Sequence, residues 1–467
     1  MFFNSLSFVG FFFVVYATYL CFQRSYKVQN VLLMIASYFF YGCWNYKFLF
    51  LLAFSTFLDY YCGLRIHQAT DERERKRWLM LSIIVSFVIL GFFKYYNFFI
   101  DSMAGLLDML GWHVSPWILD IVLPVGISFY TFHGISYVVD IYNRKFVPVK
   151  SYIDYSLFVC FYPLLVAGPI ERATHLLPQI VKPRKISADQ VNAGIYLIIW
   201  GFFKKVVIAD NVGIIADEIF NKYYTYHSGI DLWLGVLAFA FQIYGDFSGY
   251  TDIARGLSKL MGFELMLNFR LPYFSRSPSE FWQRWHISLS SWLRDYLYIS
   301  LGGNRKGEFK TYRNLMLTML LGGLWHGAAW NFVLWGFYHG GLLVAYRWFD
   351  EKRIRIIRNG FLMGLIMFGF TLGGWLLFRA KNIWQIGYFV KGLFNPVVSA
   401  GTGALALKIA VIIIPLILAE IFLYVKKDML APARFPVVLR ALFYCLLFMA
   451  ILVFGVREGA EFIYFQF

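Results

Sequence analysis

Two histidines stand in sequence contexts that would let a side chain exchange a proton with a bound substrate. His326 lies in the segment LLGGLWHGAAW (320–330), inside an apolar run that covers residues 314–346. Ionisable side chains at membrane depth are rare and usually face a cavity or a partner. A neutral imidazole accepts a proton at physiological pH, so His326 can act as a general base for a hydroxyl nucleophile.

The small residues around His326 support a second hypothesis. Glycine and alanine allow two helices to pack closely, or a substrate to approach the backbone, and both surround this histidine. A buried histidine can also simply donate one hydrogen bond across a helix interface. His339 follows in the same run, and in an unbroken helix it would point about 140° away from His326, which makes it the weaker candidate.

His286 lies in a polar segment, residues 275–313, that interrupts the apolar pattern. Ser277, Pro278 and Glu280 are typical of a helix start. The helix predicted from there is amphipathic and ends at Gly302 and Gly303. One face carries Phe281, Trp285, Leu289, Trp292 and Tyr296, and another carries His286, Ser290 and Arg294. Such a helix either lies in the membrane interface or re-enters the membrane, with His286 lining a reaction chamber.

The sequence contains no metal-ligand spacing, no phosphate-binding glycine loop and no serine-hydrolase elbow. No metal and no bound cofactor are therefore expected. Acyl transfer to a hydroxyl is the reaction class that the histidines favour.

The elements that must position these histidines are transmembrane helices. The 467 residues are 60% hydrophobic and 15% charged, with a mean hydropathy of +0.59. This composition excludes a cytosolic enzyme, a disordered chain and a disulfide scaffold. The apolar runs are continuous, which disfavours a β-barrel and predicts an all-α polytopic membrane protein. The net charge of +16 is assigned to cytoplasmic loops and lipid headgroups, not to nucleic acid.

The basic residues of the first loops predict the orientation. Loops 23–30 and 64–77 hold seven lysines and arginines, whereas loops 43–47 and 101–116 hold only Lys47. The positive-inside rule then places the N-terminus outside and the basic loops in the cytoplasm. Further apolar runs lead to a C-terminal segment, residues 457–467, that is predicted outside. Residues 1–467 are expected to form one integral-membrane domain, with a number of crossings that is uncertain by two or more.

Several long motifs resemble the membrane-bound O-acyltransferases, in the branch that acetylates alginate, peptidoglycan and cellulose. The strongest are residues 281–307 and 317–340, and residues 123–142, 161–173 and 244–256 also match. The resemblance implies a ring of tilted helices, with re-entrant or interfacial helices, around a central chamber open to both sides. It also implies that His326 is the catalytic histidine and that His286 is a second active-site histidine.

The C-terminus carries a further motif of this branch. Residues 462–467 read FIYFQF and match an FxYxxF ending found in polysaccharide-acylating members. The resemblance implies that Tyr464 carries the acyl group, although an aromatic membrane anchor is the simpler alternative. A phenol and a thiol have similar pKa values, about 10 and 8.5, so a tyrosine ester keeps much of the transfer potential of a thioester.

These observations give one mechanistic hypothesis. Acetyl-CoA, a substrate, enters from the cytoplasm and its phosphates meet Arg294, Arg305 and Lys306, while Trp325 or His286 steadies the oxyanion. The acetyl group leaves Tyr464 outside a bacterial inner membrane, for a polysaccharide or for a serine-hydrolase-like (SGNH) acetyltransferase partner. D-alanyl transfer to teichoic acid and a non-enzymatic transporter or channel are the alternatives. The sequence does not identify the polymer.

Overall fold

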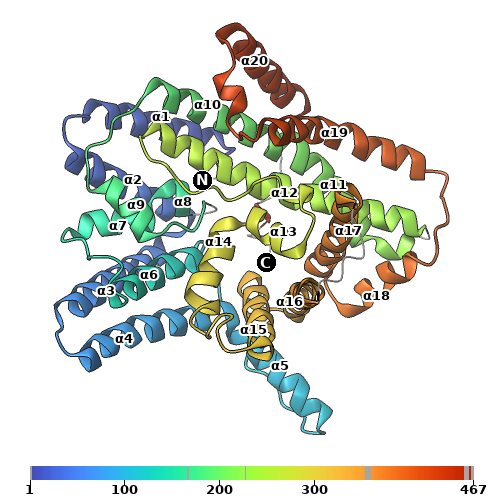
Figure 1. The fold of residues 1–467 in the computed structure, drawn as a ribbon, viewed down its shortest axis with the longest axis horizontal. Helices are drawn as coiled ribbons and strands as arrows, with labels where there is room; N and C mark the ends of the chain where they lie inside the picture. Colours follow the sequence, from blue (N-terminus) through green and yellow to red (C-terminus); the bar gives the residue numbers. More distant parts are fainter. Residues whose placement is uncertain (1–2, 166–167, 227, 353–358, 457–461, 464–467) are drawn as a thin grey trace. The chain divides into compact units, whose positions relative to one another are not determined.

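The computed structural model describes residues 3–165, 168–226, 228–352, 359–456 and 462–463. Within these ranges every regular element is a helix (Figure 1). The contacts divide the chain into two compact units. The first unit holds Met1–Ser187 and Ser258–Met266, and the second holds Ala188–Leu257 and Leu267–Phe467.

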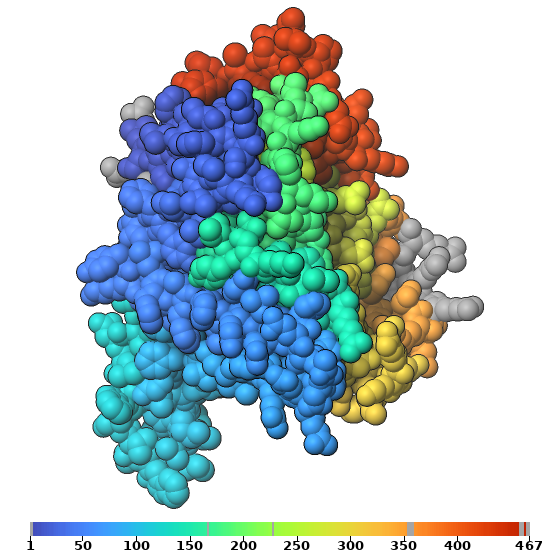
Figure 2. Space-filling view, turned by 90° about the vertical axis from the view of Figure 1, so that its left-hand side faces the viewer, coloured from blue at the N-terminus to red at the C-terminus, as the bar shows by residue number. Residues whose placement is uncertain are grey.

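The first unit is built from short and medium helices. Its α3 packs on both α4 and α6, and α2 packs on α7. None of the described residues of α5 is buried, and Figure 2 shows this cyan segment projecting from the blue helices of the unit. The elements are α1 (Leu6–Cys21), α2 (Tyr26–Asn45), η1 (Tyr46–Phe48), α3 (Leu49–Gln68), α4 (Glu72–Leu90), η2 (Gly91–Tyr95), α5 (Tyr96–Met109), α6 (Ile127–Tyr142), α7 (Tyr152–Cys160), α8 (Tyr162–Leu165) and α9 (Ala173–Ile180).

The second unit holds both candidate histidines. The long helix α12 starts in the second unit. The segments η3 and η6 are π-helices. The elements are α10 (Ala188–Phe202), η3 (Phe203–Ala209), α11 (Asp210–Asn221), η4 (Tyr223–Thr225), α12 (Gly229–Leu260), η5 (Pro272–Phe274), α13 (Pro278–Arg284), α14 (Ile287–Trp292), η6 (Leu293–Tyr298), α15 (Glu308–His326), α16 (Trp330–Glu351), α17 (Gly360–Arg379), α18 (Ile383–Gly392), α19 (Thr402–Lys426), η7 (Ala431–Arg434) and α20 (Val437–Phe454).

Seven helical segments of the described chain are long and apolar enough to cross a membrane. They are Tyr26–Gln68, Glu72–Met109, Ala188–Asn221, Gly229–Leu260, Gly360–Arg379, Thr402–Lys426 and Val437–Phe454. Large apolar side chains of α19 and α20 point outward, whereas Lys204, Lys205 and Asp246 are buried. Apolar surface outside and charge inside is the arrangement that a lipid solvent requires. The prediction of an all-α polytopic membrane protein is confirmed.

The apolar run 314–346 is a helical hairpin and not one helix. α15 ends at His326, the chain turns through residues 327–329, and α16 runs back along α15. The small residues make this pairing close: a Cβ on Gly323 would lie 2.2 Å from the Phe332 carbonyl oxygen. The expectation that His339 points away from His326 is therefore wrong, because it assumed an unbroken helix. The Trp335 ring lies between the two histidines and contacts both His326 and His339.

Replacing Gly336 by alanine should loosen this hairpin. The new Cβ would lie 2.4 Å from the Met319 carbonyl oxygen, so the two helices would have to move apart. We expect a loss of about 1–3 kcal/mol in the free energy of unfolding, measured by thermal or denaturant unfolding in detergent. Gly341→Ala is the matched control, because nothing lies within 4 Å of its added Cβ. Equal stability of the two variants would contradict close packing as the role of Gly336.

Candidate active site

His286 is buried at a break between two short helices. The amphipathic helix predicted from Ser277 to Gly302 is interrupted here: α13 ends at Arg284, and His286 has a left-handed φ of 44°. Ser277 caps α13 as predicted, accepting a hydrogen bond from the Glu280 N–H. The prediction of one unbroken helix is wrong, because α13 ends at Arg284 and α14 begins only at Ile287, and this break turns the buried His286 ring inward. A non-glycine residue in this conformation costs about 1–3 kcal/mol and is typical of functional sites.

Asn268 holds His286 in one orientation. The Asn268 side-chain oxygen lies 3.1 Å from His286 Nδ1. The same oxygen accepts hydrogen bonds from the Ser288 backbone N–H at 3.2 Å and from the Ser288 hydroxyl at 2.9 Å. An atom that faces a backbone N–H must be the amide oxygen, so His286 Nδ1 carries the proton and donates it.

The protonation state of His286 follows from its burial. His286 lies outside the seven candidate spans and is completely buried. Burial lowers the pKa of the His286 imidazole to about 3, so the ring is neutral at physiological pH. Since Nδ1 holds the proton, Nε2 carries the lone pair and is a hydrogen-bond acceptor.

Replacing Asn268 by leucine should destabilise the site strongly. The change removes the acceptor for His286 Nδ1 and for both Ser288 donors. Each buried donor left without an acceptor costs about 1–3 kcal/mol, so the free energy of unfolding in detergent should fall by about 3 kcal/mol or more. Ser288→Ala, which removes one of the three donors, should cost about 1 kcal/mol. A similar loss in both variants would show that Asn268 does not organise the site.

His326 lies next to His286 in the folded chain. It ends α15 and is 5% exposed, and its ring centre is 6.4 Å from that of His286. The neighbouring Trp325 contacts both rings, with ring centres 5.1 Å from His326 and 6.1 Å from His286. A reacting group between two rings at this separation can lie within hydrogen-bonding distance of both. The structure thus brings His326, His286 and Trp325 together.

Aromatic side chains surround the histidine pair. Trp335 of α16 and Phe378 of α17 contact the His326 ring edge to face, at 5.0 and 5.4 Å between ring centres. Phe247 of α12 contacts the His286 ring at 4.7 Å. Beyond Trp335, His339 is buried among Phe281 and Trp282. These apolar walls exclude water, which strengthens polar interactions with a bound substrate.

The three basic residues predicted to bind the donor lie on the surface. Arg294 is largely exposed in η6 and pairs with Asp295 at 2.8 Å. Arg305 and Lys306 are also exposed, in the turn between Gly303 and α15. The three basic residues are therefore not part of the buried site around His286 and His326, whereas Trp325 contacts both histidine rings. Their binding to the donor stays a prediction.

Tyr464 lies outside the described residues, but the two residues before it are described. Phe462 and Ile463 are buried, at 0% and 2% exposure. The Phe462 ring contacts Phe247 at 5.9 Å and Tyr250 at 4.5 Å, between ring centres. Because Phe247 also contacts His286, one ring separates this part of the C-terminal segment from the histidine pair.

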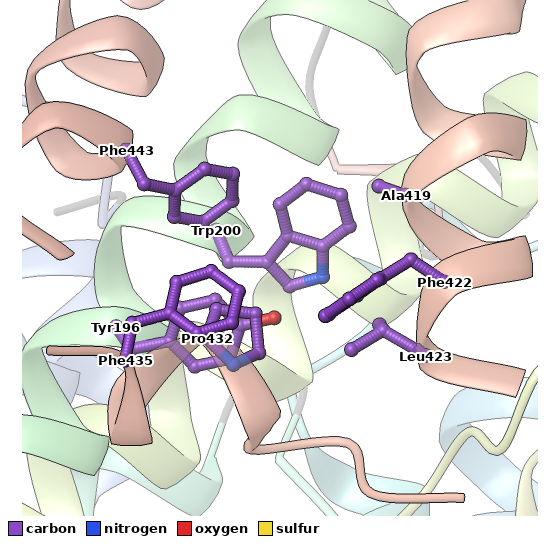
Figure 3. Close-up of a pocket in the computed structure, with 8 residues that line it drawn as sticks. All are labelled: Tyr196, Trp200, Ala419, Phe422, Leu423, Pro432, Phe435 and Phe443. Carbon is purple, nitrogen blue, oxygen red and sulfur yellow. The ribbon is translucent and has the colours of Figure 1, made fainter. Parts of the chain in front are cut away.

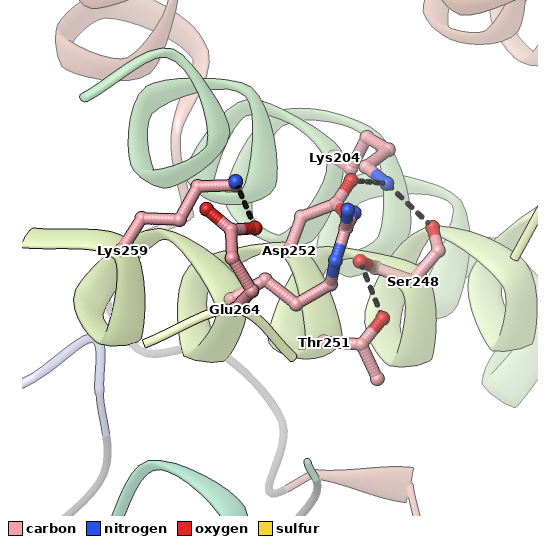
Figure 4. A network of polar contacts seen from close by, with 7 residues as sticks. Lys204, Ser248, Thr251, Asp252, Lys259 and Glu264 are labelled. Atoms are coloured by element: carbon pink, nitrogen blue, oxygen red, sulfur yellow. Dashed lines mark hydrogen bonds and ion pairs between the residues drawn. The ribbon is translucent and has the colours of Figure 1, made fainter. Parts of the chain in front are cut away.

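Buried charges at the junction of η3 and α12 were not identified from the sequence. Lys205 pairs with Asp210 at 2.9 Å and with Asp246 at 2.7 Å. Lys204 bonds to Ser248 and Asp252, as Figure 4 shows. The π-helical geometry of η3 lets two adjacent lysines reach partners on α12. Two lysines inside the apolar run 192–209 are the signal that could have revealed them.

His133 and His175 both contact Glu171 in the first unit. The Glu171 N–H donates to His133 Nε2 at 3.1 Å, and the Glu171 carboxylate lies 2.7 Å from His175 Nδ1. The carboxylate also accepts the Met266 N–H. These bonds account for both histidines as parts of a structural network.

A separate pocket in the second unit is apolar. It is lined by helices α10, α19 and α20 and by η7, with no charged side chain (Figure 3). In this lining Tyr196 is the one titratable side chain, and no histidine or carboxylate lines the pocket beside it to act as a base. The pocket is formed by Tyr196, Trp200, Ala419, Phe422, Leu423, Pro432, Phe435 and Phe443.

Comparison with known proteins gives a consistent result. The sequence model of MBOAT, the membrane-bound O-acyltransferase family, matches residues 30–383. The probable alginate O-acetylase AlgI of Pseudomonas aeruginosa is 45% identical over 371 residues, which cover 79% of this chain and 70% of that protein. The peptidoglycan O-acetyltransferase of Helicobacter pylori is 38% identical over 389 residues, with 77% and 73% covered. The teichoic acid D-alanyltransferase of Bacillus subtilis is 28% identical over 283 residues, with 55% and 69% covered.

Proposed function

Since the chain belongs to the membrane-bound O-acyltransferase family, we propose that it transfers acetyl groups from cytoplasmic acetyl-CoA to a polysaccharide outside the membrane. Family membership makes it a membrane-bound acyltransferase and decides against a transporter or channel. Acetyl transfer is favoured because the relatives named as O-acetylases match at higher identity and over more of the chain than the D-alanyltransferases. The orientation, with both termini outside a bacterial inner membrane, is part of the proposal.

The first half-reaction forms an ester on Tyr464. His326 takes the phenolic proton while the phenol oxygen attacks the thioester carbonyl carbon. The carbonyl oxygen becomes an oxyanion, and we assign its stabilisation to the Trp325 indole N–H. The carbon–sulfur bond then breaks, and the protonated His326 returns its proton to the departing CoA sulfur. Atoms and charge balance without a metal or a redox partner.

His286 has a different role from His326 in this proposal. Its Nδ1 proton is committed to Asn268, so the ring presents an acceptor nitrogen to a substrate. An acceptor cannot stabilise an oxyanion, and the single proton of the phenol goes to His326. We therefore assign the oxyanion to Trp325, and His286 to orienting acetyl-CoA by accepting a hydrogen bond from one of its amide N–H groups.

The second half-reaction moves the acetyl group to the polymer. A sugar hydroxyl attacks the tyrosine ester, the phenol leaves, and the sugar keeps the acetyl group. Because an alkyl alcohol is a poorer leaving group than a phenol with a pKa of about 10, this step is downhill. A partner enzyme of the SGNH serine-hydrolase type would relay the group, or the polymer would react directly.

The observation that carries the proposal is the position of the described tail residues. Phe247 contacts both His286 and Phe462, and Tyr464 follows Phe462 by two positions in the sequence. A carrier tyrosine has to reach the catalytic histidine, and this arrangement supports that requirement. An aromatic membrane anchor would not need Phe462 and Ile463 to be buried in the protein.

The experiment uses sealed inside-out membrane vesicles that contain the acceptor polysaccharide. Acetyl-CoA labelled in the acetyl group is added outside, which is the cytoplasmic face, and base-labile label is measured on the polymer. We expect label on the polymer with acetyl-CoA and none in vesicles that lack this chain. Label that arrives only from a D-alanyl carrier protein would replace the proposal by D-alanyl transfer. Absence of label from either donor would reject both.

A further inference from the structure

We propose that Lys205, Asp246, Phe247 and Tyr250 form a docking site for the C-terminal segment of this chain, with Asp246 as its positioning residue. We call these four residues the tail dock. We assign the tail dock the role of positioning the acyl-carrying tyrosine, and this role rests on the function proposed above. The dock itself rests on contacts among described residues of the second unit.

The main contact joins the backbone of the tail to a carboxylate. The Ile463 N–H donates a hydrogen bond to Asp246 Oδ2 at 2.7 Å. Asp246 is buried, and its other oxygen lies 2.7 Å from Lys205 Nζ. Hydrogen bonds to an ionised, buried acceptor are roughly twice as strong as neutral ones. Asp246 therefore connects the tail to the interior charge cluster.

The charge balance explains why the cluster needs a donor from the tail. Lys205 carries one positive charge and faces two carboxylates, those of Asp210 and Asp246. One lysine cannot satisfy every lone pair of two buried carboxylates, and unsatisfied buried acceptors are costly. The Ile463 N–H supplies a bond to Asp246 that the lysine does not. Docking of the tail thus satisfies one buried oxygen of Asp246.

Aromatic packing fixes the side chain next to this bond. Phe462 is fully buried against Phe247 and Tyr250, which lie one turn apart on α12. The start of the tail is also held on η3, where the Val456 N–H donates to the Val206 carbonyl oxygen at 3.1 Å. The described residues on both sides of 457–461 therefore contact the η3–α12 junction.

This mode of docking suits a segment that carries a reacting side chain. Asp246 binds the main chain, so it holds the tail without using the side chain that does chemistry. Fixing the segment beside the histidine pair converts an encounter into an intramolecular step, with a high effective concentration of the phenol. Asp246 acts through the tail and does not touch the acetyl donor.

The test compares two aspartates that differ in one contact. Asp246→Ala and Asp210→Ala each remove one carboxylate from Lys205, but only Asp246 bonds to the tail. Purified protein in detergent is treated with a carboxypeptidase, and mass spectrometry follows trimming past residue 463. We expect Asp246→Ala to speed trimming about tenfold and Asp210→Ala to leave it near the unaltered rate. Equal trimming rates in both variants would overturn the dock.

A second pair of variants leaves the buried charges intact. Ile463→Pro removes the donor N–H, whereas Ile463→Val keeps it. Because carboxypeptidases cleave poorly at proline, an endoprotease of broad specificity replaces the carboxypeptidase for this pair. Cleavage of the tail should accelerate in the proline variant alone, and acceleration in neither would reject the Asp246 bond. In active membranes, Ile463→Pro should lower the maximal rate of acetyl transfer while the KM for acetyl-CoA stays unchanged.

The trimming assay needs no acetyl donor, so its outcome is independent of the proposed function. If trimming behaves as expected but Tyr464 never becomes acetylated, the dock stands and the carrier role falls. If Tyr464 is acetylated but trimming ignores Asp246 and the Ile463 N–H, the carrier role stands and the dock falls.

Discussion

Membranes that contain the His326→Ala variant are expected to acetylate polymer about 100- to 10,000-fold more slowly than membranes with the unaltered chain. The reason is the loss of the group that takes the phenolic proton. A phenol has a pKa of about 10, so little phenolate forms at neutral pH without a base. The labelled-vesicle assay measures the effect directly.

The control for His326→Ala is a substitution of a histidine that has no role in the proposed mechanism. His113 is exposed and pairs with Asp108, so His113→Ala should retain the full rate. Unfolding of His326→Ala in detergent must also be measured, since the ring contacts Trp335 and Phe378. A folded His326→Ala protein that retains at least half of the activity would remove His326 from the mechanism.

The candidate histidine pair could be predicted from the sequence because ionisable groups stand out in apolar surroundings. His326 is such a group, and the resemblance added His286. The helical character of most apolar runs was also predictable, since about 20 apolar residues are needed to cross a bilayer. These features depend on local composition and not on contacts between distant segments.

The breaks beside the histidines could not be predicted, because both depend on tertiary contacts. Nothing local to Trp285 and His286 ends a helix; the break is held by hydrogen bonds to Asn268, which is remote in sequence. The turn after His326 depends on the close pairing of α15 with α16. A prediction that continues the helical periodicity through either break assigns the following side chains to the wrong face of the helix.

Lys205 and Asp246 show a different kind of omission. Both are charged residues in apolar segments: Lys205 lies in the apolar run 192–209 and Asp246 in the motif 244–256. The rule that drew attention to His326 applies equally to them. Their partners, however, lie on separate helices, so the pairing of Lys205 with Asp246 required the fold.

The Tyr464→Phe variant should abolish acetylation of the polymer, because it removes one oxygen atom that forms the ester. Phenylalanine keeps the ring, so a role as an aromatic anchor would be preserved, and this variant separates the two hypotheses. The labelled-vesicle assay should give no signal above that of vesicles without the chain. Mass spectrometry of the C-terminal peptide from the unaltered chain should show an acetyl group on Tyr464.

The matched control is Tyr46→Phe, since Tyr46 is 72% exposed in the first unit and has no part in the mechanism. It should retain the full rate. Polymer acetylation that persists in Tyr464→Phe, together with no acetyl adduct on Tyr464, would leave the tail as an anchor. The acetyl group would then have to pass from the thioester directly to an acceptor hydroxyl at the histidine pair. His326→Ala would still be inactive in that case, so the two variants together distinguish the base from the carrier.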